Sequence, residues 1–163
     1  MSQIQEEIRQ QKPFQSPAHL AAVSLLRTAN LLVRHYSAVV GTKDITLQQY
    51  NVLRILRGSG PAGLPTLEIG ERMVEQTPGI TRLLDRLEKK HFVKRERSAS
   101  DRRQVMVRIA PAGLEVLTQL EDAVMEADRA GMAGLNAASL DHFVDLLDQV
   151  RGHLHEILKD ARP

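Results

Sequence analysis

With 163 residues, 42% of them apolar but only 3% aromatic, the chain can form one domain with a helical core, or such a domain with an oligomerisation arm. It has no cysteine, no apolar signal segment and no run of 18 apolar residues, which excludes disulfides, thiol chemistry and a membrane span and predicts a soluble, cytoplasmic protein. The net charge is +2, yet 11 of the 22 Lys and Arg residues lie within residues 72–108, whereas residues 109–163 carry ten acidic and four basic side chains.

Capping signals predict two helices in the first part of the chain, after a flexible extension over residues 1–15. Ser16 and Pro17 form an N-cap followed by proline at the first helical position, and an apolar face then recurs at three- and four-residue spacing as far as Gly41. Thr46 and Gln49 form a capping box that begins a second helix, which ends at residues 58–61.

Residues 64–90 predict a short strand followed by a helix-turn-helix. Residues 64–65 can form a minimal strand, and Thr66 can cap a short helix. The apolar residues of that helix are Leu67, Ile69 and Met73. After a tight turn, Thr77 and Pro78 provide a second N-cap with proline behind it, and the helix that follows runs to about Lys90 with a single apolar stripe. Two helices joined by so short a turn are typical of a helix-turn-helix.

Beyond His91 the apolar period changes from about 3.6 to 2, which predicts a β-hairpin. Residues 92–96 and 104–109 form its strands, and the polar residues 97–103 form its turn. A hairpin directly after a helix-turn-helix is the wing of a winged helix. The predicted fold class is therefore mainly α with a small β-hairpin wing.

The last third of the chain predicts two helices. Pro111 begins a long helix that breaks near Gly131 and Gly134, and Asn136 caps the final helix. Apolar residues alternate along the final helix at spacings of three and four, namely Leu140, Phe143, Leu147, Val150, Leu154 and Ile157. Such a seam predicts a partner helix, and hence a dimer interface. His153 and His155 are two residues apart and point in different directions, so no metal site is predicted.

The helix over residues 78–90 carries the candidate DNA contacts. With its apolar stripe facing inward, the outward residues are Pro78, Arg82, Asp85 and Lys89, flanked by Thr81 and Arg86. Arg and Thr suit base edges, and Lys suits phosphates. The alternative is an ordinary exposed face joined by ion pairs at i+3 and i+4. The basic hairpin favours DNA binding, because its tip places three arginines within reach of a minor groove, namely Arg97, Arg102 and Arg103.

Two segments resemble the MarR family of transcriptional regulators. TPGITRLLDRLEKKHFVKRERSASDRRQVMVRIAPAGLEVL resembles the family's recognition helix, wing and following helix, and ITLQQYNVLRIL resembles the segment just before them. With the flanking helices, the resemblance covers roughly residues 17–160. The Asp-x-Arg motif at residues 101–103, together with TRLLDRLEKK, is the most specific part of it. Gly70 and Ala110 stand where the family usually has Ala and Thr.

The resemblance implies a homodimer that binds a pseudo-palindromic operator on double-stranded DNA. The first and last helices interlock, which divides the chain into a dimerisation helix at 16–44, a winged helix-turn-helix at 45–110 and C-terminal dimerisation helices at 111–163. Arg103 matches the wing arginine that enters the minor groove, and Asp101 matches the acid that orders the wing turn. The residues that match recognition-helix contacts are Thr77, Pro78, Thr81, Arg82 and Arg86.

Many family members release DNA when a small aromatic or phenolic effector binds near the dimerisation helices, and here Arg34, His35 and Tyr36 are candidates for lining such a pocket. The function expected is thus that of a DNA-binding regulator, most simply a repressor. The alternative is a winged-helix module that binds protein without specific DNA binding. No phosphate-binding loop, nucleophile elbow or metal-binding HExxH motif occurs, so we expect neither an enzyme nor a bound cofactor.

Overall fold

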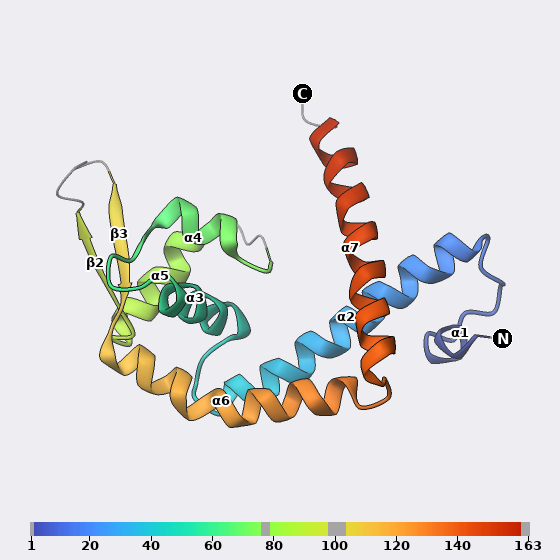
Figure 1. Cartoon of the computed structure of the whole chain (residues 1–163), viewed down its shortest axis with the longest axis horizontal. Coiled ribbons are helices and arrows are strands. Elements are labelled where there is room, and N and C mark those ends of the chain that lie inside the picture. The colour runs from blue at the N-terminus through green and yellow to red at the C-terminus, as the bar shows by residue number, and fades with distance from the viewer. Residues whose placement is uncertain (1, 76–78, 98–103, 161–163) are drawn as a thin grey trace. The chain divides into compact units, whose positions relative to one another are not determined.

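The computed structural model describes residues 2–75, 79–97 and 104–160, and it is mostly helical with one small sheet (Figure 1). The elements in chain order are α1 (Gln3–Glu7), α2 (Pro17–Gly41), α3 (Leu47–Gly58), β1 (Leu64–Pro65), α4 (Thr66–Arg72), α5 (Ile80–Lys89), β2 (Val93–Arg97), β3 (Val105–Ile109), α6 (Pro111–Met132) and α7 (Ala137–Asp160). The predicted fold class is confirmed. The chain forms two compact units, Met1–Ala127 and Asp128–Pro163.

The predicted caps of α2 and α3 are confirmed. The Ser16 side chain accepts a hydrogen bond from the backbone N–H of His19 at 3.1 Å, with Pro17 at the first helical position. Thr46 and Gln49 form the complete capping box, with bonds of 3.0 and 3.2 Å between each side chain and the other's backbone N–H. These local contacts satisfy N–H groups that a helix leaves unpaired at its start.

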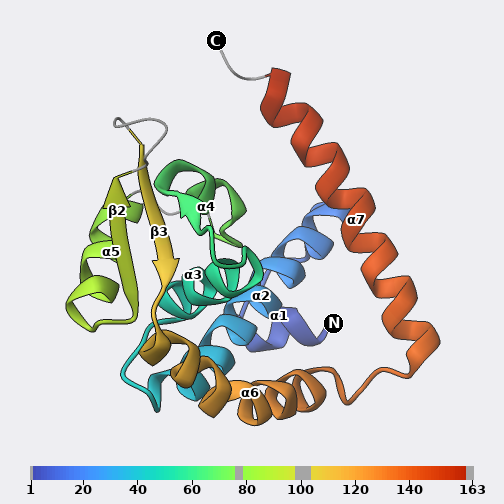
Figure 2. The same ribbon diagram turned by 60° about the vertical axis from the view of Figure 1, so that its left-hand side comes forward.

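The three strands form one antiparallel sheet in the order β1-β3-β2. Val93 pairs with Ile109 and Arg97 with Val105 along the hairpin, and Leu64 of β1 pairs with Val107 on the other edge of β3. The predicted two-residue strand is therefore confirmed, while β2 begins and ends one residue later than predicted. The hairpin lies beside α5 in Figure 2.

The core of the first unit joins the helix-turn-helix to the sheet and to α6. Among its fully buried side chains are Leu53 of α3, Ile69 of α4, Leu84 of α5, Val107 of β3 and Leu120 of α6. Burial of each such side chain contributes about 1.5 to 3 kcal/mol. The helix-turn-helix and the sheet are thus held by one continuous core, which fixes their positions relative to one another.

Three details of the helix-turn-helix differ from the predictions. Thr66 is the first helical residue of α4 and not its cap, because Pro65 occupies the cap position. Of the three apolar residues named for this helix, Ile69 and Met73 are buried but Leu67 is 74% exposed. The helix after the turn begins at Ile80, two residues later than predicted, and Gly79 caps it with φ 103°. This left-handed backbone is readily adopted by glycine, and it lets the chain enter the helix without a side-chain cap.

Gly113, in the first turn of α6, lies against the start of the wing. A Cβ atom at this position would lie 2.3 Å from the backbone oxygen of Phe92, which also accepts a hydrogen bond from the N–H of Ala110 at 2.9 Å. The Gly113→Ala substitution is expected to lower the free energy of unfolding by about 1 to 3 kcal/mol, because backbone atoms must move apart. Urea unfolding measures this change.

The matched control is Gly70→Ala, which also adds one methyl group to a helix of the same unit. Nothing lies within 4 Å of the Cβ position at Gly70. This substitution is expected to stabilise the protein by about 0.5 to 1 kcal/mol, since alanine loses less conformational freedom on folding. A Gly113→Ala protein as stable as the wild type would contradict the close packing of α6 against the wing.

The second unit consists of the end of α6 and the helix α7. The predicted N-cap of α7 is confirmed, because Asn136 Oδ1 accepts a hydrogen bond from the backbone N–H of Ser139 at 2.9 Å. No residue of α7 is buried, and apolar side chains remain about half exposed along it, including Val150 at 46%, Leu154 at 48% and Ile157 at 49%. The seam from Leu140 to Ile157 stays a predicted dimer interface.

The first fifteen residues, predicted as a flexible extension, include the short helix α1. Helix α1 is connected to α2 by an ion pair between Glu7 and Arg27 at 3.4 Å. The rings of Phe14 and His19 meet edge to face, with their centroids 5.2 Å apart. These contacts link the N-terminal segment to the beginning of α2.

Candidate nucleic-acid interface

Helix α5 is strongly amphipathic, and its apolar side packs into the core of the first unit. Leu84 and Leu87 are fully buried, and Ile69 and Met73 contribute buried side chains from α4 and its end. The start of the turn is tied to α3, where Asn51 Oδ1 accepts the backbone N–H of Val74 at 2.9 Å. The helix is therefore held firmly enough to present its opposite side in a fixed orientation.

The opposite side of α5 is exposed and basic. Thr81, Arg82, Arg86 and Lys89 are all exposed, as the helical wheel predicts. Within the described part of the chain, none of the three cations forms an ion pair. The alternative of a face joined by ion pairs along the helix therefore does not describe these residues. Three cations on one helix face that pair with no described carboxylate form a surface suited to a polyanion.

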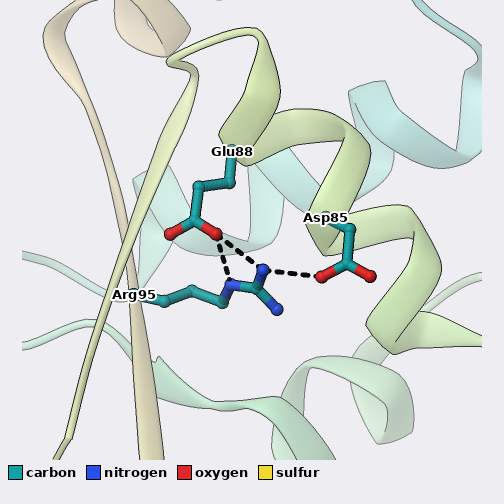
Figure 3. Close-up of polar contacts among 3 residues, drawn as sticks. All are labelled: Asp85, Glu88 and Arg95. Atoms are coloured by element: carbon teal, nitrogen blue, oxygen red, sulfur yellow. Dashed lines mark hydrogen bonds and ion pairs between the residues drawn. The ribbon is translucent and has the colours of Figure 1, made fainter.

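Asp85 behaves differently from the outward-facing residue that was predicted. Its side chain turns to the wing, where its Oδ1 lies 2.6 Å from the Arg95 guanidinium. The same guanidinium makes two bonds to Glu88 Oε2, at 2.9 Å from Nε and 2.6 Å from Nη2 (Figure 3). Asp85 keeps its predicted side of α5, with its side chain 45% exposed, but a partner on another element engages its carboxylate. We call Asp85, Glu88 and Arg95 the helix–wing clamp.

The clamp was missed because only its two carboxylates lie close together in the sequence. Asp85 and Glu88 are three residues apart and so share one side of the helix, which was a readable clue. Their partner Arg95 was assigned to a strand without a role. The Arg95 side chain is 24% exposed, so it is the most shielded member of the clamp, while Asp85 and Glu88 are 45% and 40% exposed.

The clamp perturbs the ionisation of Glu88. The hydrogen bond from Arg95 lowers the pKa of Glu88 below its ordinary value, although desolvation acts in the opposite direction. A lowered pKa means that the folded state favours the carboxylate form. The contact therefore contributes stability above the ordinary pKa of glutamate, and this contribution is lost as the pH falls through the lowered native pKa. At neutral pH Glu88 is therefore a carboxylate.

The Arg95→Gln substitution is expected to raise the pKa of Glu88 toward its ordinary value. The substitution removes the guanidinium, and with it the hydrogen bonds that stabilise the Glu88 carboxylate. Titration of the side-chain carboxyl carbon by NMR measures the change, with Glu115 on α6 as a reference in the same spectra. A Glu88 pKa that does not respond to the substitution would contradict the clamp.

The wing presents one described cation at the end of its first strand. Arg97 was predicted in the turn, but it is the last residue of β2, where its side chain is exposed. Arg108 on β3 is instead engaged, with a 2.8 Å ion pair to Glu96 and a 3.2 Å bond to the carbonyl of Ala62. The other predicted site residues of the wing and helix start lie outside the described residues, namely Thr77, Pro78, Asp101, Arg102 and Arg103.

A second ion pair holds the far end of α5. The ammonium of Lys90 lies 2.5 Å from Oδ2 of Asp44, in the connection between α2 and α3, and it also bonds the backbone carbonyl of Asp44. Lys90 lowers the pKa of Asp44, chiefly through this hydrogen bond. The Asp44 side chain is almost fully exposed, so the pair orients the helix end and contributes little stability.

The candidate effector residues lie on α2, away from the basic face of α5. Arg34 and His35 are exposed, and Tyr36 is half-buried. His35 Nε2 lies 3.3 Å from the carbonyl of Ala127, and its ring centroid is 5.9 Å from that of Tyr36. His35 therefore already has a hydrogen-bond partner on α6.

The described residues contain no helix long and apolar enough to cross a bilayer. Over the same ranges, no three His, Asp or Glu side chains come together as a possible metal site.

The fold and the exposed face of α5 define a winged helix-turn-helix protein. The family model described as the MarR family matches residues 45–105. The crystal structure of a MarR transcription factor from Planctomyces limnophilus is similar to this chain, with a TM-score of 0.65 and a sequence identity of 34%. The match covers 84% of this chain and 99% of that chain. The chain belongs to the MarR family of transcriptional regulators.

Two further comparisons are consistent with this. A mutant MarR from E. coli, solved in complex with operator DNA, has the same fold at 22% identity, with a TM-score of 0.73 and coverage of 92% of this chain and 99% of that chain. The regulator TtmR from Methylorubrum extorquens is 29% identical over 127 residues, which are 78% of this chain and 63% of that protein. The chain spans 66%, 94% and 40% of the length of the first three curated relatives.

Proposed function

We propose that the protein is a sequence-specific regulator that binds double-stranded DNA as a homodimer and represses transcription. The observation that carries the proposal is the exposed face of α5, where Arg82, Arg86 and Lys89 pair with no carboxylate of the described residues. A helix anchored by a core and bearing free cations on its outer side is suited to a major groove. The E. coli relative solved with operator DNA supports the same use of the fold.

In this proposal, helix and wing have separate tasks. Arg82 and Arg86 donate to base edges together with Thr77, Pro78 and Thr81, while Lys89 contacts phosphate. Arg97, Arg102 and Arg103 bind along the minor groove, with Asp101 ordering the turn. These residues belong to the winged helix-turn-helix that we assign to 45–110.

The homodimer is proposed from the apolar surface of α7. Residues 16–44 and 111–163 would supply the interface, with the Leu140 to Ile157 seam at its centre. Exposed apolar side chains recur along the whole of α7, which a monomer would leave in water. A dimer would place two recognition helices on successive major grooves, about 34 Å apart.

The proposal includes release by a small aromatic or phenolic effector near Arg34, His35 and Tyr36. The neighbouring rings of His35 and Tyr36 support this chemistry, since an aromatic ligand can pack against them. Arg34 is exposed beside them and can pair with an acidic group of such a ligand.

Selection of bound duplexes from a random DNA pool tests the proposed function. The expected result is a palindrome whose half-sites are about one helical turn apart, because each protomer contributes one recognition helix. Recovery of single, unpaired half-sites would contradict the dimeric mode. A pool that shows no enrichment would contradict specific DNA binding and favour a module that binds protein.

A further inference from the structure

Asp85 occupies the middle of the surface that the proposed function turns toward DNA. It follows Arg82 by three residues and precedes Lys89 by four, so the three share one side of α5. Arg82 and Lys89 are exposed, and the Asp85 side chain is 45% exposed. A free carboxylate between these two cations would oppose binding, because its charge repels the DNA backbone.

The structure places Asp85 where this repulsion is reduced. The side chain of Arg95 extends from β2 to both carboxylates. Its Nη2 donates to Asp85 and to Glu88, and its Nε donates to Glu88. Figure 3 shows the guanidinium between the two carboxylates, which come from successive turns of α5. The planar fork of arginine fits such an arrangement better than the single ammonium of lysine.

We infer that Arg95 is a positioning residue that holds and partly neutralises Asp85 and Glu88, so that the cations of the outer face of α5 meet DNA with less opposing negative charge. This inference rests on the proposed DNA binding by α5. Arg95 acts through the two carboxylates and touches no base or phosphate itself.

A simpler role for the clamp is to brace the wing against the helix. The two roles differ in what Asp85 does once Arg95 is absent. If Arg95 masks charge, removal of the Asp85 charge restores binding to an Arg95 variant. If Arg95 only braces the wing, the brace stays broken and the charge of Asp85 is irrelevant.

A double-mutant cycle with Asp85→Asn and Arg95→Gln separates these roles. Affinity for the selected operator is measured by fluorescence anisotropy at about 0.1 M salt, where charges still act over about 10 Å. In the wild-type background, Asp85→Asn is expected to change the affinity by less than about threefold, because the charge is already masked. Arg95→Gln is expected to weaken binding about tenfold, and adding Asp85→Asn to it should restore most of that loss.

Equal effects of Asp85→Asn in both backgrounds would overturn the inference, as would an Arg95→Gln protein with wild-type affinity. Thermal unfolding and circular dichroism show whether each variant is folded. If Arg95→Gln alone fails to fold, the same comparison is made with Glu88→Gln present throughout, because this removes one unpaired charge. A wild-type protein that binds no DNA would defeat the proposed function itself, whereas tight wild-type binding without coupling would defeat the inference alone.

Discussion

Replacing Leu147 and Leu154 by Asp is expected to yield folded monomers that bind operator DNA at least about 100-fold more weakly than the wild type. The two side chains lie one heptad apart on α7, and neither has a partner that buries it within the second unit. Two carboxylates in the seam would have to be buried without partners on dimerisation. Sedimentation equilibrium measures the loss of the dimer, and anisotropy measures the loss of affinity.

The matched control places Asp at His142 and Gln149, which are also seven residues apart on α7. Both residues are exposed. Each lies two residues after a seam residue, Leu140 or Leu147, and therefore about 200° around the helix from it. This variant is expected to remain dimeric with nearly unchanged affinity. A Leu147→Asp, Leu154→Asp protein that still forms a dimer and binds DNA normally would show that the interface lies elsewhere.

The Arg82→Ala substitution is expected to weaken operator binding by about 1 to 3 kcal/mol and to relax sequence preference at one position of each half-site. Arg82 is exposed on α5 and pairs with no described carboxylate, so its donors are available to a base. Anisotropy with operator variants changed at single positions measures both effects.

Arg151→Ala is the control for Arg82→Ala, since it removes the same charge from α7. Arg151 pairs with Asp148 on its own helix, and the loss of this exposed pair is expected to leave affinity unchanged within about twofold. If both substitutions weaken binding equally, the effect of Arg82 is one of net charge, and a base contact is refuted.

Features that depend on neighbouring residues in the chain were predictable. The N-cap at Ser16, the capping box at Thr46 and the cap at Asn136 were read correctly because each motif is complete within four residues. The hairpin was predictable from its period of two. The exposure of Arg82, Arg86 and Lys89 followed from the helical wheel, because the apolar stripe of α5 leaves one orientation for the helix.

Features that depend on contacts between elements were not predictable. The helix–wing clamp was missed because the choice of Arg95 as the partner of Asp85 depends on how β2 lies against α5. The need for glycine at Gly113 arises from the carbonyl of Phe92, which only the folded chain brings near. Leu67 was predicted only as an apolar residue of the short helix, and residue type does not tell which apolar positions a seven-residue helix buries; here it buries Ile69.

Fluorescence anisotropy across a salt series tests the central claim most directly. The wild-type protein is titrated into labelled DNA from upstream of its own gene and, separately, into scrambled DNA of the same composition. The account predicts tighter binding to the upstream DNA, with an affinity that falls steeply as salt rises, because Lys and Arg side chains displace counterions from phosphates. Weak binding to both DNAs, equal in affinity and insensitive to salt, would contradict it.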